Sequence, residues 1–183
     1  MTTTKVVFAF IFLVFLSSCS HPRRTYLVDE AAIRAFSQQL DSHSSATSVL
    51  QMRCTTPIKV HYLSTYLAPE ANLFRSLEVD PSSTVKLRHV ELMCQNIVLS
   101  EAWNWYIPGR LTQAMNTQLE TTNIPFGKVV KPLNFIRQKL QSHIFEQPND
   151  AILENRAVLK RQSDSAPIAL VIEKYFPTAL HSY

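Results

Sequence analysis

Two charged side chains, Arg88 and Glu173, interrupt otherwise apolar strand patterns. Residues two apart share a face of a strand, so each charge is expected to lie among apolar neighbours. An ionised group on an apolar face is costly unless it has a partner, and such groups often mark functional sites. An arginine fork binds a carboxylate through two parallel hydrogen bonds, and a carboxyl group partly removed from water can donate a proton. The pair therefore predicts a site for an anionic substrate that needs a proton at a leaving oxygen.

A structural interpretation of the same two residues stays open. Arg88 and Glu173 could pair with each other, or both could face water, because the opposite face of the Arg88 strand is also apolar. Between them in the sequence lies one Pro-x-Gly turn, Pro125-Phe126-Gly127. The pattern alone does not decide between a functional pair and a structural one.

The N-terminus predicts export. Val6–Leu16 is an uninterrupted apolar run behind Lys5, shorter than the roughly 20 residues that span a bilayer, and typical of a signal peptide. It ends in a Leu-Ser-Ser-Cys sequence that resembles a bacterial lipobox. We therefore expect a signal peptide over 1–18, lipidation of Cys19, a tether over 19–28 and one domain over 29–183. Lipid chains would anchor the protein to a membrane facing the periplasm, with the outer membrane as the default. The alternatives are an ordinary signal peptide cleaved near Ser20 and a short uncleaved anchor.

Composition excludes several classes of function. The chain has 18 Lys and Arg against 14 Asp and Glu, without a basic cluster interleaved with aromatics, so we expect no nucleic-acid partner. Six scattered histidines predict no metal site, and two glycines leave no phosphate-binding loop, so we expect no cofactor. Cys54 and Cys94 could pair in an oxidising compartment, but we favour two small buried thiols. We expect a monomer.

The elements that would position the charged pair form an α+β pattern. Asp29–Leu40 has apolar residues at helical spacing, and further helices are expected over 111–119 and from Pro132 to Ile144. Alternation predicts strands over these ranges: 57–66, 84–94, 97–107, 151–161 and 168–176. The short connections at 95–96 and 163–167 indicate antiparallel hairpins. The sequence therefore predicts a single antiparallel sheet with helices packed against it.

Three segments, in order, resemble the chorismate pyruvate-lyase superfamily. Leu87–Leu92 resembles the strand that carries its arginine, and Asn123–Lys128 is similar to its Pro-[Ile/Leu]-Gly turn. Pro167–Pro177 resembles its last strand, which carries a glutamate. The resemblance implies a six-stranded antiparallel sheet flanked by helices, with an internal ligand cavity. It also implies elimination of pyruvate from chorismate to leave 4-hydroxybenzoate, a step that serves ubiquinone biosynthesis, without metal or cofactor.

The resemblance also implies roles for individual residues. Arg88 would bind a ring carboxylate, Phe126 and Gly127 would lie over the aromatic ring, and Glu173 would assist departure of enolpyruvate. Arg156 is the one match to a Trp-Gly-Arg motif at the start of another strand, where this chain reads Glu154-Asn155-Arg156. Arg88 and Glu173 are thus the expected catalytic residues, and Arg88, Phe126, Gly127 and Arg156 the expected substrate-binding residues.

The compartment favours other members of the same fold. Chorismate is made in the cytoplasm, whereas the N-terminus predicts export. The alternative is a lipoprotein that binds a small aromatic or anionic ligand without chemistry, like the UTRA-type ligand-sensing domains of related transcriptional regulators. A third possibility is a structural lipoprotein that keeps only the scaffold.

Overall fold

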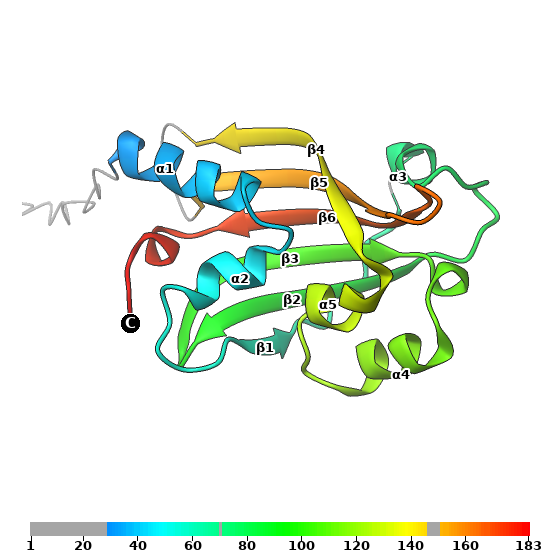
Figure 1. Cartoon of the computed structure of the whole chain (residues 1–183), viewed down its shortest axis with the longest axis horizontal. Coiled ribbons are helices and arrows are strands. Elements are labelled where there is room, and N and C mark those ends of the chain that lie inside the picture. The colour runs from blue at the N-terminus through cyan, green and yellow to red at the C-terminus, as the bar shows by residue number, and fades with distance from the viewer. Residues whose placement is uncertain (1–28, 70, 146–150) are drawn as a thin grey trace, which may run out of the picture.

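A computed structural model describes residues 29–69, 71–145 and 151–183 as one antiparallel six-stranded sheet with helices (Figure 1). The strand order is β1-β2-β3-β6-β5-β4, so the last strand is inserted at the centre of the sheet. The expected signal peptide, Cys19 and tether lie outside the described residues. The strands are β1 (Lys59–Tyr62), β2 (Lys86–Cys94), β3 (Ile97–Tyr106), β4 (Phe135–Ile144), β5 (Leu153–Arg161) and β6 (Pro167–Tyr175).

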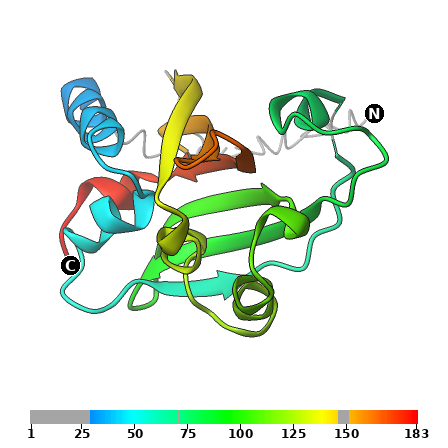
Figure 2. The same cartoon turned by 45° about the vertical axis from the view of Figure 1, so that its right-hand side comes forward.

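Helices cover mainly one face of the sheet, which we call the inner face. In Figure 1, α1 (Glu30–Asp41), α2 (Ala46–Gln51) and α5 (Phe126–Val129) lie in front of the strands. The helix α4 (Gln113–Thr121) packs beside α5, and α3 (Ala71–Ser76) lies at the opposite end of the sheet from α1 and α2 (Figure 2). Short 3-10 turns complete the fold at Pro108–Arg110, Lys131–Leu133 and Pro177–Leu180.

The first helix illustrates how the sequence builds this layer. Asp29 caps α1 by accepting a hydrogen bond from the Ala31 backbone N–H at 2.9 Å. Ile33, Phe36 and Leu40 recur at helical spacing and are all buried against the sheet. The predicted helix over 29–40 is therefore confirmed, as are the β2–β3 and β5–β6 hairpins.

Each face of the sheet has its own apolar packing. On the inner face, one cluster joins α1 and α2 to the sheet around Val90, Ala102 and Tyr175. A second inner cluster joins α4 and α5 to the sheet around Tyr106 and Val171. The opposite face, which we call the outer face, carries a smaller cluster of Trp105, Val158 and Leu170 beneath α3. The inner face is therefore the main core of the domain.

The helix predicted from Pro132 to Ile144 is wrong. After one 3-10 turn, residues 135–144 form β4, an edge strand paired with β5. Most of its side chains are exposed, so burial imposes no clear alternation on the sequence. A bulge between Lys139 and Gln141 shifts the register by one residue. The apolar residues of this strand therefore do not alternate regularly in the sequence, and their spacing resembles that of a helix. The strand predicted over 57–66 is likewise shorter, at Lys59–Tyr62.

Cys54 and Cys94 form a disulfide, with 5.7 Å between their Cα atoms. The expectation of two separate thiols is therefore wrong. The two positions meet because Cys54 follows α2 and Cys94 ends β2, and both side chains enter the first inner cluster. Alternation along the sequence carried no information on this contact between distant segments.

The described residues contain neither a membrane-spanning helix nor a metal-binding cluster. Within 29–69, 71–145 and 151–183, no helix is long and apolar enough to cross a bilayer. Over the same ranges, no group of three or more His, Cys, Asp and Glu side chains is placed to hold a metal ion.

Candidate functional site on the inner face

Arg88 is buried, with 3% exposure, and connects three parts of the inner face. Its Nε and Nη2 donate to the Tyr62 hydroxyl of β1 at 2.8 and 2.5 Å. Nη2 also donates to the Ile124 carbonyl at 2.7 Å, just before α5. Its Nη1 is buried without a hydrogen-bond partner among the described residues. Arg88 therefore holds the segment that leads into the Pro-x-Gly turn and keeps one donor unused.

Glu173 is also buried and pairs with a residue that the sequence did not indicate. Its Oε2 accepts from Arg137 Nη2 of β4 at 2.5 Å and from the Tyr175 hydroxyl at 2.9 Å. Burial alone would lower the pKa of Arg137, but the Glu173 carboxylate raises it above its usual value. Burial and then Glu173 raise the pKa of Tyr175 well above its ordinary value, so its phenol remains a donor. Glu173 is thus held as a hydrogen-bond acceptor.

Arg88 and Glu173 share the inner face but do not pair with each other. Arg88 lies opposite Asn104 of β3, and Glu173 lies opposite Ala102, two residues along the same strand. The two charges therefore occupy neighbouring cross-strand rows. This arrangement excludes the structural alternative in which they neutralise each other, and it excludes the alternative in which both face water.

The space beside Glu173 is small. Its volume is about 40 Å³, and its walls include Arg137, Asn104, Phe126 and Gly127 as well as Glu173. That volume has room for about one or two water molecules. An aromatic acid would therefore need this cavity to widen.

A cleft lies directly outside this cavity, between α2 and α5. We call it the vestibule; its volume is about 330 Å³, and it shares Ser45, Thr47, Gly127 and Phe135 with the cavity walls. Lys128 and Lys131 also line it. Gly127 lines both spaces and approaches α2 closely, since a Cβ there would lie 3.1 Å from the Ser45 Oγ. The vestibule is therefore a cationic approach to the buried ion pair.

Arg88 also borders a cleft at the β1 edge of the sheet. This cleft, of about 310 Å³, is lined by Tyr62, Tyr106 and Lys86 among others. Burial raises the pKa of Tyr106 to about 12, with a further contribution from Glu120. Tyr106 packs on Phe126, with ring centroids 5.7 Å apart. Arg88 therefore lines the edge cleft and is not among the residues that line the cavity beside Glu173.

The structure separates Arg156 from the other expected site residues. Asn155 lies opposite Glu173 on the inner face, so the next residue, Arg156, lies opposite Ile172 on the outer face. The expected substrate-binding set of Arg88, Phe126, Gly127 and Arg156 therefore does not converge on one space. Phe126 and Gly127 do line the cavity beside Glu173.

Sequence reasoning missed several polar members of the inner face. Asn104 and Asn155 are buried within apolar strand patterns, which is the same signal that singled out Arg88. Thr47 is buried on α2. Arg137 had no usable signal, because its segment was assigned to a helix.

Comparison with solved structures identifies the fold. PhnF from Mycobacterium smegmatis has a TM-score of 0.55 at 11% identity, over 73% of this chain and 64% of that chain. The effector domain of the same PhnF has a TM-score of 0.50 at 11% identity, over 65% of this chain and 80% of that domain. The ligand-binding domain of a GntR-family regulator from Bordetella bronchiseptica has a TM-score of 0.49 at 12% identity, over 65% of this chain and 82% of that chain. The chain has the UTRA-like fold of such effector domains, which is a chorismate lyase-like fold.

Sequence comparison gives the family. The chain is 32% identical to the uncharacterized protein y4mC of Sinorhizobium fredii, over 79% of this chain and 73% of that protein. The protein therefore belongs to the same family as y4mC. No family model matches the chain.

Proposed function

We propose that this protein binds a small aromatic monoanion on the inner face, with the carboxylate at Arg88. The proposal rests on the surroundings of Arg88. Its guanidinium is buried, and no described acidic side chain pairs with it. One of its nitrogens also lacks a hydrogen-bond partner among these residues. A buried cation in this state is stabilised by an anion that accepts its free donor.

The charge balance of the inner face supports a single negative charge on the ligand. Arg88 and Arg137 contribute two positive charges and Glu173 one negative charge, so the buried set has an excess of one cation. Lys128 and Lys131 in the vestibule add positive charge along the approach. Such a surface attracts anions and raises their local concentration.

The ligand ring would lie beneath Phe126 and Gly127, and its far end would meet the Arg137–Glu173 pair. Because the cavity beside Glu173 holds only about 40 Å³, binding requires a shift of α5 or of the Phe135 side chain. The effector domain of PhnF from Mycobacterium smegmatis shares this fold, which agrees with a binding role.

A chorismate lyase is the second candidate. It is favoured by the placement of Arg88 and Glu173 in neighbouring rows of one buried face. The contacts of Glu173 favour binding instead, because a carboxylate that accepts from a guanidinium and a phenol is poorly placed to donate a proton.

The binding proposal is tested by calorimetric titration of the full-length chain with 4-hydroxybenzoate. We expect saturable binding that Arg88→Met weakens by about tenfold or more, because a charge-assisted contact is lost. Arg34→Met, on the exposed surface of α1, is the matched control and should leave affinity unchanged. Circular dichroism verifies that each variant is folded. Equal affinity in the Arg88 and Arg34 variants would refute the proposal.

Catalysis is tested separately with chorismate. Formation of 4-hydroxybenzoate and pyruvate that disappears in Glu173→Gln would establish the lyase. Absence of product, combined with Arg88-dependent binding of 4-hydroxybenzoate, would establish the binding protein.

We also propose that the protein is exported and anchored through lipid on Cys19. The N-terminal sequence carries this proposal, and the Cys54–Cys94 disulfide is in keeping with an oxidising compartment. Incorporation of labelled palmitate by the wild type, but not by Cys19→Ala, is the expected result. Labelling of both proteins, or of neither, would contradict it.

A further inference from the structure

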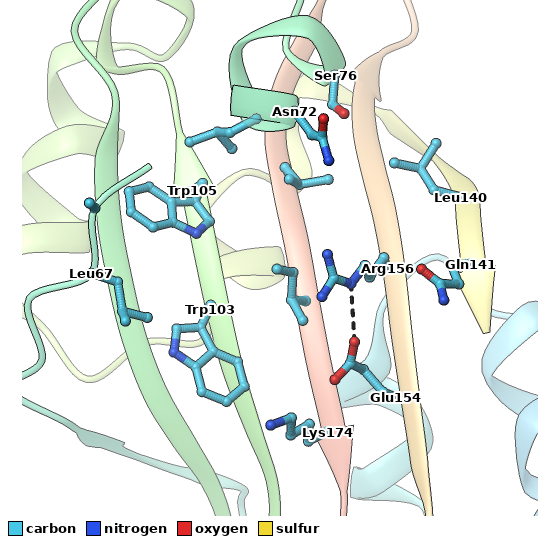
Figure 3. A pocket seen from close by; sticks show the side chains of 14 residues that line it. Leu67, Asn72, Ser76, Trp103, Trp105, Leu140, Gln141, Glu154, Arg156 and Lys174 are labelled. Atoms are coloured by element: carbon cyan, nitrogen blue, oxygen red, sulfur yellow. Dashed lines mark hydrogen bonds and ion pairs between the residues drawn. The ribbon is translucent and has the colours of Figure 1, made fainter. Parts of the chain in front are cut away.

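The outer face of the sheet carries a cleft of its own, separate from the spaces described on the inner face and at the β1 edge. Its volume is about 390 Å³, which lies within the usual range for small-molecule pockets. Figure 3 shows Trp103 and Trp105 along one side, Arg156 and Glu154 near the centre, and Lys174 at one end. We call this cleft the tryptophan groove.

Apolar side chains from two neighbouring strands form the floor of the groove. Trp103 and Trp105 come from β3, and Leu170 and Ile172 come from the neighbouring strand β6. One face of Trp103 is fixed by stacking on His89, with ring centroids 4.6 Å apart and planes 17° from parallel. This support holds the indole in place and creates a rigid surface for a planar ligand.

The described residues that line the groove include two cations, Arg156 and Lys174, and one carboxylate, Glu154. The Glu154 Oε1 accepts from Arg156 Nε at 3.0 Å. The Lys174 ammonium lies over the Trp103 ring, 5.2 Å from its centroid. No described carboxylate lies within ion-pair distance of that ammonium. A cation beside an apolar floor suits an amphipathic anion.

We propose that the tryptophan groove binds a flat, two-ring aromatic molecule with one anionic group. The rings would lie on the apolar floor, and the anionic group would meet Lys174 and Arg156. The volume, the indole floor and the Lys174 ammonium each point to this class of ligand.

The chain provides its own probe for this site, because its only two tryptophans both line the groove. The test is a titration of the full-length chain with 2-naphthoate, followed by tryptophan emission corrected for absorption by the probe. The neutral analogue 2-naphthamide has the same ring system and lacks the charge. We expect saturable binding of 2-naphthoate, and at least about tenfold weaker binding of 2-naphthamide.

Variants decide where the probe binds. Arg156→Gln/Lys174→Gln should weaken 2-naphthoate binding by about tenfold or more, and Lys174→Gln alone should give a smaller loss if the double variant does not fold. Arg88→Met, on the inner face, and Lys139→Gln, elsewhere on β4, should leave the affinity unchanged. This contrast keeps the outcome separate from that of the proposed inner-face function.

Several results would overturn the proposal. These are no saturable change in emission, equal affinity for the two naphthalene probes, and loss of binding in Arg88→Met alone. A dimer in sedimentation experiments that dissociates in Lys174→Gln, together with no binding of 2-naphthoate, would also overturn it and would assign the groove to a second copy of the chain.

Discussion

The two faces of the sheet carry similar ion pairs in different surroundings. On the inner face, the side chains of Arg137 and Glu173 are 12% and 10% exposed, and on the outer face those of Arg156 and Glu154 are 35% and 17% exposed. The inner pair lines a cavity of about 40 Å³, and the outer pair lines a cleft of about 390 Å³. The comparison shows that one type of contact can fix a core or line an open surface, according to its burial.

The largest expected effect comes from removing one partner of each pair. Arg137→Met leaves Glu173 buried and uncompensated, which should lower the free energy of unfolding by about 3–5 kcal/mol. Arg156→Met should cost at most about 1 kcal/mol, since its pair is partly solvated. Urea unfolding measures both values, and Arg137→Met/Glu173→Gln should recover most of the loss. Equal losses in the two single variants would remove the distinction between the faces.

The next effect concerns the covalent link within the inner core. Replacing both cysteines in Cys54→Ala/Cys94→Ala should lower the free energy of unfolding by about 2–4 kcal/mol, because the unfolded chain is no longer constrained by a bridge between residues 40 apart. Wild type unfolded in reductant is the control. We expect tryptophan emission of the folded variant to be unchanged, because the groove is on the other face. A shifted emission maximum would indicate that the faces are coupled.

A smaller effect is expected at the vestibule. In Gly127→Ala the new Cβ lies 3.1 Å from the Ser45 Oγ, so it narrows the path to the inner cavity and should weaken 4-hydroxybenzoate binding about five- to tenfold. Gly109→Ala is the matched control, because a Cβ there meets nothing within 4 Å. Neither variant should change 2-naphthoate binding in the groove. Identical affinities in the two glycine variants would argue against an approach through the vestibule.

The smallest expected effect is a change in the pKa of Asp164, which lies outside both faces in the β5–β6 hairpin. The Arg161 guanidinium lowers the pKa of Asp164 from 3.8 to about 2. Because the folded-state pKa is depressed, the stabilisation is present above the unfolded value and is lost as pH falls toward 2. An NMR titration should show the lowered pKa of Asp164, and Arg161→Gln should return this pKa toward 3.8. Ligand affinities measured near neutral pH should be identical in this variant, and a change would place the hairpin within one of the sites.

The sequence predicted the elements that are largely buried or that have one buried side. Helix α1 shows clear periodicity because one side meets the core, and strands β2, β3, β5 and β6 are rich in apolar residues because most of their positions are buried. Strand β4 lies at an edge and is largely exposed, so tertiary pairing rather than local pattern determines it. The two inner-face charges were predicted because a charge is unusual in a buried strand.

The partners of those charges could not be predicted in the same way. Arg137 reaches Glu173 only across the β4–β5–β6 pairing, and the disulfide joins α2 to the end of β2. Both contacts depend on strand order, which local periodicity does not contain. Arg156 was grouped with the inner-face residues by resemblance, whereas the observed register places it on the outer face.

The alternation of side chains along β5 and β6 has a consequence for the evolution of this family. Glu173 and Lys174 are consecutive but serve opposite faces, as do Asn155 and Arg156. A one-residue insertion or deletion inside either strand would exchange the two sets of groups, whereas substitutions can alter one face and leave the other intact. Gaps in an alignment of relatives should therefore fall in the connecting hairpin at 162–166, and the lengths of both strands should be constant.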